Sequence, residues 1–467
     1  MKRLFPHLHA PLLPLAVCLA AGIAIGNPFS SGLPLLLLFL TLVTVCFFIG
    51  RWPLAQSICV WTCLVVLGML TAPGEEKRTA DGEWAEAVVV STPSDRPKTV
   101  LVKLLLPATG EERRCYFWKG ARSQQLALGD NLLVCIHDGQ FVSRDSWQPG
   151  GDGFNRLSHF QRLRIRALQW RGRLLQRLMQ QGGDEQALAV VAAMALGDKS
   201  ALSRELRDTY SATGASHILA LSGLHLSIIY MLLTRLIPGR RRFWPGQVLT
   251  ILAIWAFALL TGLSVSIVRA AVMLTVYSLF ALGGRRQAPL GVLSFTAIVL
   301  LLTDSRSLFD IGFQLSFMAM LGILLFTPVF ERWVSLPWME SHRPARWLYG
   351  LLAVSAAAQL GTAPLVAYYF GRFSTWFLLT NIIAIPAATL ILYSALLTLL
   401  IPAMGSLLLW LAEALNNCLE QITKLPLASI EGLHPSILQV AMTYVAIAAL
   451  GVLLSYWHPQ RQTPYYT

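Results

Sequence analysis

Apolar runs of about twenty residues recur along this chain and limit what it can fold into. A helix of that length matches the ~30 Å hydrocarbon layer of a membrane. With 55% hydrophobic and 13% charged residues among 467, the chain is too apolar for a soluble domain. We therefore expect an α-helical, polytopic membrane protein. The predicted spans are residues 11–26, 33–50, 54–71, 217–237, 247–262, 265–282, 288–303, 310–330, 348–370, 376–401 and 436–456.

Two segments affect the number of spans. The first apolar run has the form of a signal peptide, but two more runs follow it directly, so we interpret it as a retained span. Residues 403–424 are also apolar, yet polar residues recur on one face at helical spacing, which suits a helix in the membrane interface or lining a cavity. These residues are Glu413, Asn416, Asn417 and Glu420. The total is eleven or twelve.

Basic residues between the spans predict the orientation. If the chain crosses the membrane at each predicted span, all of these basic residues fall on the same side of the membrane. By the positive-inside rule that side is the cytoplasm. The residues are Lys2, Arg3, Arg51, Arg235, Arg240, Arg241, Arg242, Arg285, Arg286, Arg332, Arg343 and Arg346. The N-terminus is then cytoplasmic, and the insert of residues 72–216 lies outside the cytoplasm.

The insert begins with a small β domain. Residues 83–143 contain short alternating runs separated by turn signals, typical of a small barrel or sandwich. Residues 74–150 carry ten Lys or Arg against eleven Asp or Glu, so the domain lacks the basic surface of a strong nucleic-acid binder. Arg114, Tyr116 and Trp118 share one strand face, which suits base stacking or packing onto the membrane domain.

An Arg-rich helix follows over residues 154–181. Its predicted apolar face consists of Leu157, Phe160, Leu163, Ala167, Leu168, Leu174 and Leu178, and seven arginines cover the rest. Docking on anionic lipid head groups is the favoured interpretation. The alternative is a guide for a polyanion such as DNA, for which we select Arg162, Arg166, Arg173 and Arg177. The predicted domains are residues 1–72, 73–150, 151–216 and 217–467.

Known chemical motifs are scarce. The nine histidines form no HxHxDH or HExxH pattern, and no phosphate loop is present, so we expect no metal and no cofactor. Cys115 and Cys135 lie on separate predicted strands outside the cytoplasm, where a disulfide is a candidate.

Polar and helix-breaking residues interrupt five spans. Such groups are costly against lipid and usually face a bundle interior or a water-filled path. They are Ser216, His217, Ser222, Gly223, His225, Arg269, Asp310, Gln314, Ser316, Gln359, Pro364, Asn381 and Pro386. A shared pathway is the prediction. For single residues a structural role stays open: a small-residue helix contact at Ser222 and Gly223, interhelical hydrogen bonds at Gln359 and Asn381, or an ion pair of Arg269 with Asp310.

Several of these segments resemble the ComEC competence family. The longest is ALGDKSALSRELRDTYSATGASHILALSGLHLSII, and GLSVSIVRAAVM, FDIGFQLSFMAMLGI, QLGTAPLVAYYFGRFS and NIIAIP continue the similarity. The resemblance implies an OB-like β domain and an inner-membrane channel that admits single-stranded transforming DNA. It also implies partners: a periplasmic DNA receptor, a cytoplasmic motor or DNA-binding protein, and a separate nuclease. A separate nuclease is implied because we expect this protein to be a short form without the metallo-β-lactamase-like domain of longer members.

Two other functions remain open, although a non-enzymatic role is expected. An intramembrane hydrolase would use Ser222 as nucleophile with His225 or His217 as base, but that geometry is poor within one helix. A small-solute or lipid-precursor transporter would use the broken helices alone.

Overall fold

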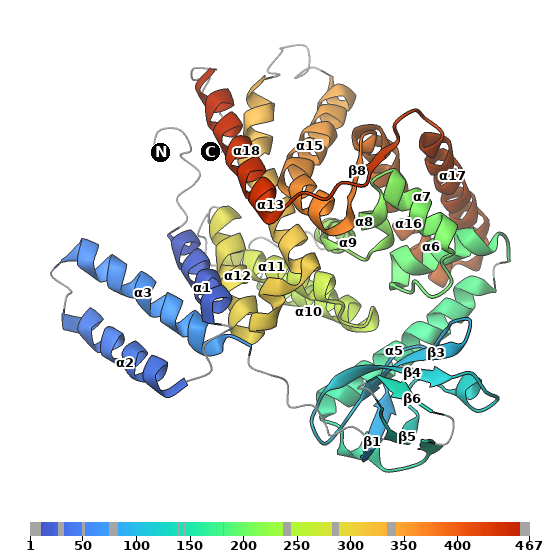
Figure 1. Cartoon of the computed structure of the whole chain (residues 1–467). Helices are drawn as coiled ribbons and strands as arrows, with labels where there is room; N and C mark the ends of the chain where they lie inside the picture. The colour runs from blue at the N-terminus through green and yellow to red at the C-terminus, as the bar shows by residue number, and fades with distance from the viewer. Residues whose placement is uncertain are drawn as a thin grey trace.

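The structure is a computed structural model that describes residues 11–26, 32–48, 52–73, 83–137, 140–143, 146–180, 182–236, 244–282, 289–333 and 342–457. Helices make up most of these residues, and one small β domain lies at the edge of the helical part (Figure 1). The predicted combination of a helical membrane protein with a small β domain is therefore confirmed at this level.

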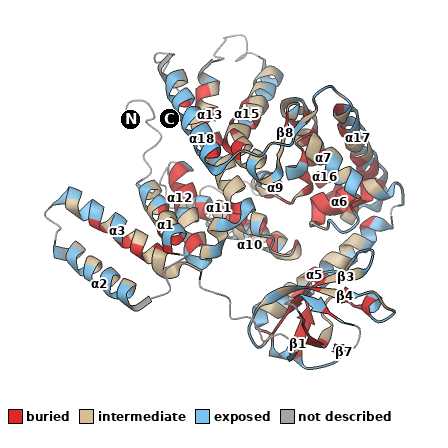
Figure 2. Ribbon diagram, in the orientation of Figure 1, coloured by how far each residue is buried: buried red, intermediate tan, exposed pale blue. Residues whose placement is uncertain are grey.

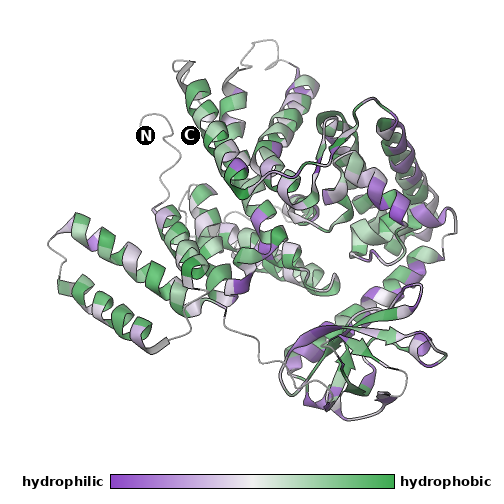
Figure 3. Cartoon of the chain, viewed as in Figure 1, coloured by the Kyte–Doolittle hydropathy of each residue, from purple (hydrophilic) through white to green (hydrophobic). Residues whose placement is uncertain are grey.

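Each of the eleven predicted spans coincides with a helix, and the hydrophobic residues in Figure 3 cover most of them. Five helices are long and apolar enough to cross a membrane: α3 (Pro53–Thr71), α13 (Ile311–Trp333), α15 (Arg343–Phe370), α16 (Phe377–Leu400) and α18 (Ile437–Trp457). Six are shorter: α1 (Leu12–Gly26), α2 (Gly32–Phe48), α9 (Gly223–Leu236), α10 (Trp244–Leu260), α11 (Val265–Leu282) and α12 (Pro289–Thr303). Five helices among the described residues meet the length criterion, fewer than the eleven or twelve spans predicted, so that total stays a prediction.

Glycines allow two pairs of helices to approach closely. A Cβ built on Gly361 of α15 would lie 2.1 Å from the Met318 carbonyl oxygen of α13, and one on Gly322 would lie 2.4 Å from the Ala357 oxygen. At the contact of α1 with α3, a Cβ on Gly22 would lie 2.0 Å from the Val65 oxygen. Helices in lipid have no hydrophobic driving force to associate, so the close van der Waals packing that small residues allow at such crossings stabilises the contact.

The β domain contains one mixed sheet. Its strands are β1 (Trp84–Val89), β2 (Ser94–Asp95), β3 (Thr99–Leu105), β4 (Glu112–Trp118), β5 (Asn131–Cys135), β6 (Phe141–Val142) and β7 (Trp147–Pro149), and η1 (Ser123–Gln125) follows β4. The order is β6-β4-β3-β1-β5-β7, with β2 on β3 and a parallel β4–β6 pair. Among the described residues the named strands form an open sheet with β6 and β7 at its two edges. One bridge links His137 to Phe141.

The predicted 151–216 linker contains four helices: α4 (Gly153–Arg156), α5 (His159–Met179), α6 (Glu185–Leu196) and α7 (Arg204–Ala212). Figure 2 shows α6 among the most buried elements, and all its residues from Ala187 to Leu196 are buried. It packs against α16 and α17 (Gly405–Thr423). Helix α6, although it lies within the predicted 151–216 linker, therefore shares a hydrophobic core with α16 and α17, and the division of the chain into domains stays a prediction. A helix that is apolar on every side is normally a core helix.

The segment left open at residues 403–424 forms η3 (Pro402–Met404) and the amphipathic helix α17. Leu408, Leu415 and Leu419 of α17 are buried in the same core as α6. Asn417 and Glu420 are exposed. Two short strands, β8 (Arg372–Ser374) and β9 (Ser429–Glu431), pair antiparallel and tie the α15–α16 connection to the α17–α18 connection.

Candidate functional site

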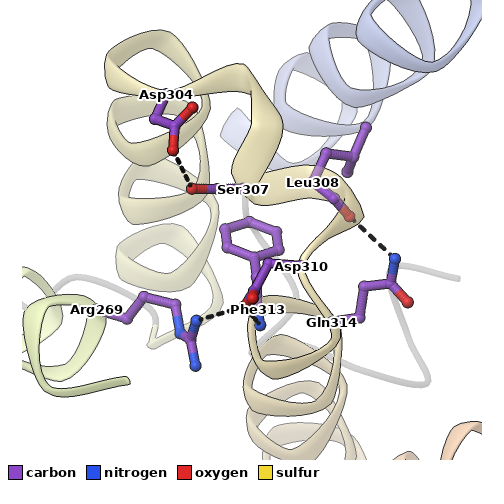
Figure 4. Close-up of polar contacts among 7 residues, drawn as sticks. All are labelled: Arg269, Asp304, Ser307, Leu308, Asp310, Phe313 and Gln314. Atoms are coloured by element: carbon purple, nitrogen blue, oxygen red, sulfur yellow. Dashed lines mark hydrogen bonds and ion pairs between the residues drawn. The ribbon is translucent and has the colours of Figure 1, made fainter. Parts of the chain in front are cut away.

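Arg269 of α11 forms an ion pair with Asp310, the residue that precedes α13 (Figure 4). Its Nη1 is 3.3 Å from Oδ1 of Asp310, and its side chain is 4% exposed whereas that of Asp310 is 46% exposed. The same Oδ1 accepts the Phe313 backbone N–H at 2.8 Å, so Asp310 also caps the start of α13. Of the alternatives for Arg269, the ion pair with Asp310 is confirmed.

Gln314 extends this network to a third helix. Its Nε2 donates to the Leu308 carbonyl at 3.0 Å, in η2 (Ser305–Phe309), and its Oε1 accepts from the Tyr369 hydroxyl of α15 at 2.7 Å (Figure 4 shows the first contact). We define the Arg269 network as Arg269, Asp310, Gln314 and Tyr369. Sequence reasoning missed Tyr369; its place in the QLGTAPLVAYYF segment was the only available signal.

Ser222 directly precedes α9, and His225 lies in its first turn. The helix of the predicted span 217–237 starts later than predicted, because α8 (Ser216–Leu219) ends and α9 starts anew at Gly223. Ser222 Oγ lies 3.2 Å from His225 Nδ1, and the Ser222 backbone N–H donates to that nitrogen at 3.4 Å. The helix break therefore places serine and histidine within hydrogen-bond reach, contrary to the poor geometry expected.

The start of α9 also lies beside the Arg269 network. A Cβ on Gly223 would be 3.5 Å from Cβ of Ala270, the residue after Arg269. The predicted small-residue contact at Gly223 is therefore present. Ser216 and His217 lie on the short helix α8 with exposed side chains, and His217 Nδ1 is 3.1 Å from the Gly214 carbonyl oxygen.

Several side-chain atoms in these helices are buried without a hydrogen-bond partner among the described residues. His225 is 0% and Asn381 9% exposed, and the orphaned atoms include His225 Nε2, Arg269 Nε, Ser355 Oγ and Asn381 Oδ1. Pro386 lies inside α16 and removes the donor for the Ile382 carbonyl. Each such group needs a partner that the neighbouring helices do not supply.

Gln359 and Pro364 of α15 instead line a cavity of about 620 Å³ between α13, α15, α16 and α18. Apart from Gln359 and Thr443, its walls are apolar, among them Phe326, Leu360 and Ile447. Ser316 is half-buried in α13. The structure thus joins Gly223, His225, Arg269, Asp310 and Gln314 in one region and leaves Gln359 in an apolar one; a role for any of them in lining a pathway stays a prediction.

The arginines of α5 separate into two groups. Arg164 pairs with Glu112 of β4, and Arg171 lies 3.4 Å from Thr92 Oγ1. Burial lowers the pKa of the Arg171 guanidinium, and Asp198 partly opposes this. Arg166, Arg173 and Arg177 are exposed and Arg162 is half-buried. Their role as DNA guides stays a prediction.

The candidate disulfide is not formed. Cys115 and Cys135 are both free thiols, because β3 and β1 lie between β4 and β5 in the sheet. Three strand spacings amount to roughly 14 Å along the sheet, beyond the reach of a disulfide. Burial raises the pKa of the Cys115 thiol to about 12.

Comparison with known proteins places these features in a family. The chain is 31% identical over 204 residues to ComE operon protein 3 of Bacillus subtilis, covering 43% of this chain and 24% of that protein. It is 25% identical over 270 residues to Recombination protein 2 of Haemophilus influenzae, covering 55% of this chain and 33% of that protein. The match thus spans at most a third of either relative. No solved structure matches the chain with significance. The family model described as Competence protein matches residues 194–457, more than half of the chain, which therefore belongs to the competence protein family.

Proposed function

We propose that this protein is a multi-pass protein of the bacterial inner membrane that conducts a single strand of DNA into the cytoplasm during natural competence. Membership of the competence protein family and similarity to a ComE operon protein and a recombination protein support a role in DNA uptake. The channel, its location and its partners go beyond this role in DNA uptake and are part of our proposal. The partners proposed are a periplasmic DNA receptor, a cytoplasmic motor or DNA-binding protein, and a separate nuclease.

The buried polar atoms without partners are the observation that carries the channel proposal. Four of them belong to four different helices: His225 in α9, Arg269 in α11, Ser355 in α15 and Asn381 in α16. Such atoms cost about 1–3 kcal/mol each when unsatisfied. Water along a shared route would satisfy them, and a polyanion needs a hydrated route with weak polar contacts.

The proposed orientation places the β domain outside the cytoplasm, following the basic residues between the spans. An OB-like arrangement of this domain is supported by the parallel pairing of β6 with β4 and by the His137–Phe141 bridge from the end of β5. Trp118 is 44% exposed on β4, and Tyr116 stacks on Phe141 with ring centroids 5.6 Å apart. Trp118 and Phe141 are exposed and Tyr116 is half-buried, and such aromatic residues suit contact with bases of a single strand.

A Ser/His hydrolase is the second candidate, favoured by the Ser222–His225 contact alone. Nδ1 of His225, however, already accepts the backbone N–H of Ser222, and its Nε2 has no orienting acid among the described residues. This arrangement matches a helix cap better than a catalytic dyad. Ser222→Ala distinguishes the two, because a hydrolase would lose nearly all activity whereas a conducting protein would be mildly impaired.

The test separates two steps of DNA uptake in the protein's own host. Deletion should abolish transformation and leave arrival of DNA in the periplasm intact. In the complemented strain, Asn381→Leu should reduce transformation at least tenfold, because it removes a buried polar group from the proposed route. Asn417→Leu, on the exposed face of α17, is the matched control at equal protein level. Loss of periplasmic DNA on deletion, or equal transformation by both variants, would contradict the proposal.

A further inference from the structure

One side of the amphipathic helix α5 packs against other parts of the protein. Ile165, Leu168 and Leu178 are buried, and Arg164 is paired with Glu112. Ile165 packs with Val88 and Leu105 of the sheet. Of the predicted apolar face of this helix, Leu157, Leu168 and Leu178 are buried in the protein, whereas Phe160 and Leu163 are exposed.

Where α5 does not contact the rest of the protein, it exposes large apolar side chains. Phe160 is 61%, Leu163 52% and Trp170 63% exposed. At 100° per residue these three fall within one strip of the helix surface, and Arg166, Arg173 and Arg177 form the adjoining strip. We call these six residues the outer face of α5. No acidic residue occurs in α5, and no ion pair of the three arginines is found among the described residues.

The position of α5 relates this face to the membrane. A Cβ on Gly262, in the loop between α10 and α11, would lie 3.1 Å from Leu168 Cδ2. Helix α5 therefore lies at the adjoining ends of α10 and α11, which in the proposed membrane location is the level of the lipid head groups. Arginine binds phosphate through two parallel hydrogen bonds, and Trp, Phe and Leu insert beside head groups in helices that lie in the interface.

We infer that the outer face of α5 binds the surface of a bilayer containing anionic phospholipid. A DNA strand offers the same phosphates and would stack on Phe160 and Trp170, but it leaves Leu163 without an apolar partner, and the adjacent β domain carries no excess of positive charge. A lipid surface accommodates all six side chains. This inference rests on the proposed membrane location and does not depend on DNA transport.

The test uses the full chain with Cys418→Ser, because Cys418 is an exposed thiol, in nanodiscs with or without phosphatidylglycerol. An environment-sensitive fluorophore is attached at Leu163→Cys. Gln176→Cys, exposed on another side of α5, is the matched control, and Met320→Cys, 36% exposed in α13, reports membrane insertion. Spin-labelled lipid and aqueous iodide serve as the two quenchers.

At Leu163 we expect lipid quenching to exceed iodide quenching at least fivefold in anionic nanodiscs, and the reverse at Gln176. Replacing Arg166, Arg173 and Arg177 by Gln should lower the equilibrium constant for contact of α5 with the membrane by up to roughly a hundredfold, because each arginine contributes about fivefold. Salt at 0.5 M should lower the same equilibrium constant. Iodide access at Leu163 equal to that at Gln176 would overturn the inference, as would protection only on addition of oligodeoxythymidine. Iodide access at Met320 as well would overturn the membrane location together with it.

Discussion

The crossing of α13 and α15 at Gly361 gives a prediction whose size follows from the structure. In Gly361→Ala the new Cβ would lie 2.1 Å from the Met318 carbonyl oxygen, whereas ordinary contact begins at 3.4 Å. The two helices must separate by the difference, about 1.3 Å. The carbonyl of Gly361 also accepts the Tyr444 hydroxyl of α18 at 2.8 Å, so the shift disturbs a third helix. Overpacking of this kind costs about 1–3 kcal/mol.

The same helix supplies a control. A Cβ on Gly350 meets nothing within 4 Å, so Gly350→Ala should gain up to about 1 kcal/mol from helix propensity. In detergent, Gly361→Ala should lower the apparent midpoint of thermal unfolding by roughly 1–3 °C, because the unfolding entropy of a chain of this length makes 1 kcal/mol equivalent to about 1 °C, while Gly350→Ala leaves it unchanged or raises it. If Gly361→Ala were as stable as Gly350→Ala, the close approach of α13 and α15 would be refuted.

The other predictions concern charge and thiol chemistry. Asp310→Asn keeps an oxygen for the Phe313 N–H but removes the charge beside buried Arg269, so the free energy of unfolding should fall by about 1–2 kcal/mol; this is less than the 3–5 kcal/mol of a fully buried pair, because the Asp310 side chain is 46% exposed. Thermal unfolding measures it, and wild-type stability would contradict the pairing. Cys115 should stay unreactive to maleimide at pH 7.5 until the protein is unfolded, while Cys418 reacts at once. Because burial raises the pKa of Cys115 from 9.0 to about 12, its thiol stays protonated in the folded state while the unfolded one ionises; stability should be constant below pH 9 and fall toward pH 12. Cys115→Ala should flatten that decline, and an unaltered slope would refute it.

Local pattern was enough to predict where helices and strands lie. The apolar runs correspond to α1–α3, α9–α13, α15, α16 and α18, and the alternating runs to the β domain, because hydrogen bonding within a helix and alternation along a strand depend on neighbours in sequence. The polar residues Arg269, Asp310 and Gln314 were identifiable for the same reason: they are conspicuous in apolar surroundings.

Only the tertiary structure decided what those elements touch. It buried α6, separated Cys115 from Cys135, directed Gln359 toward an apolar cavity, and divided the arginines of α5 between the β domain and the outside. Each outcome depends on residues far away in the chain, and periodicity within one helix does not determine which neighbour covers which side. The sequence thus determined the elements and their polarity, whereas packing determined the partner of each exposed or buried group.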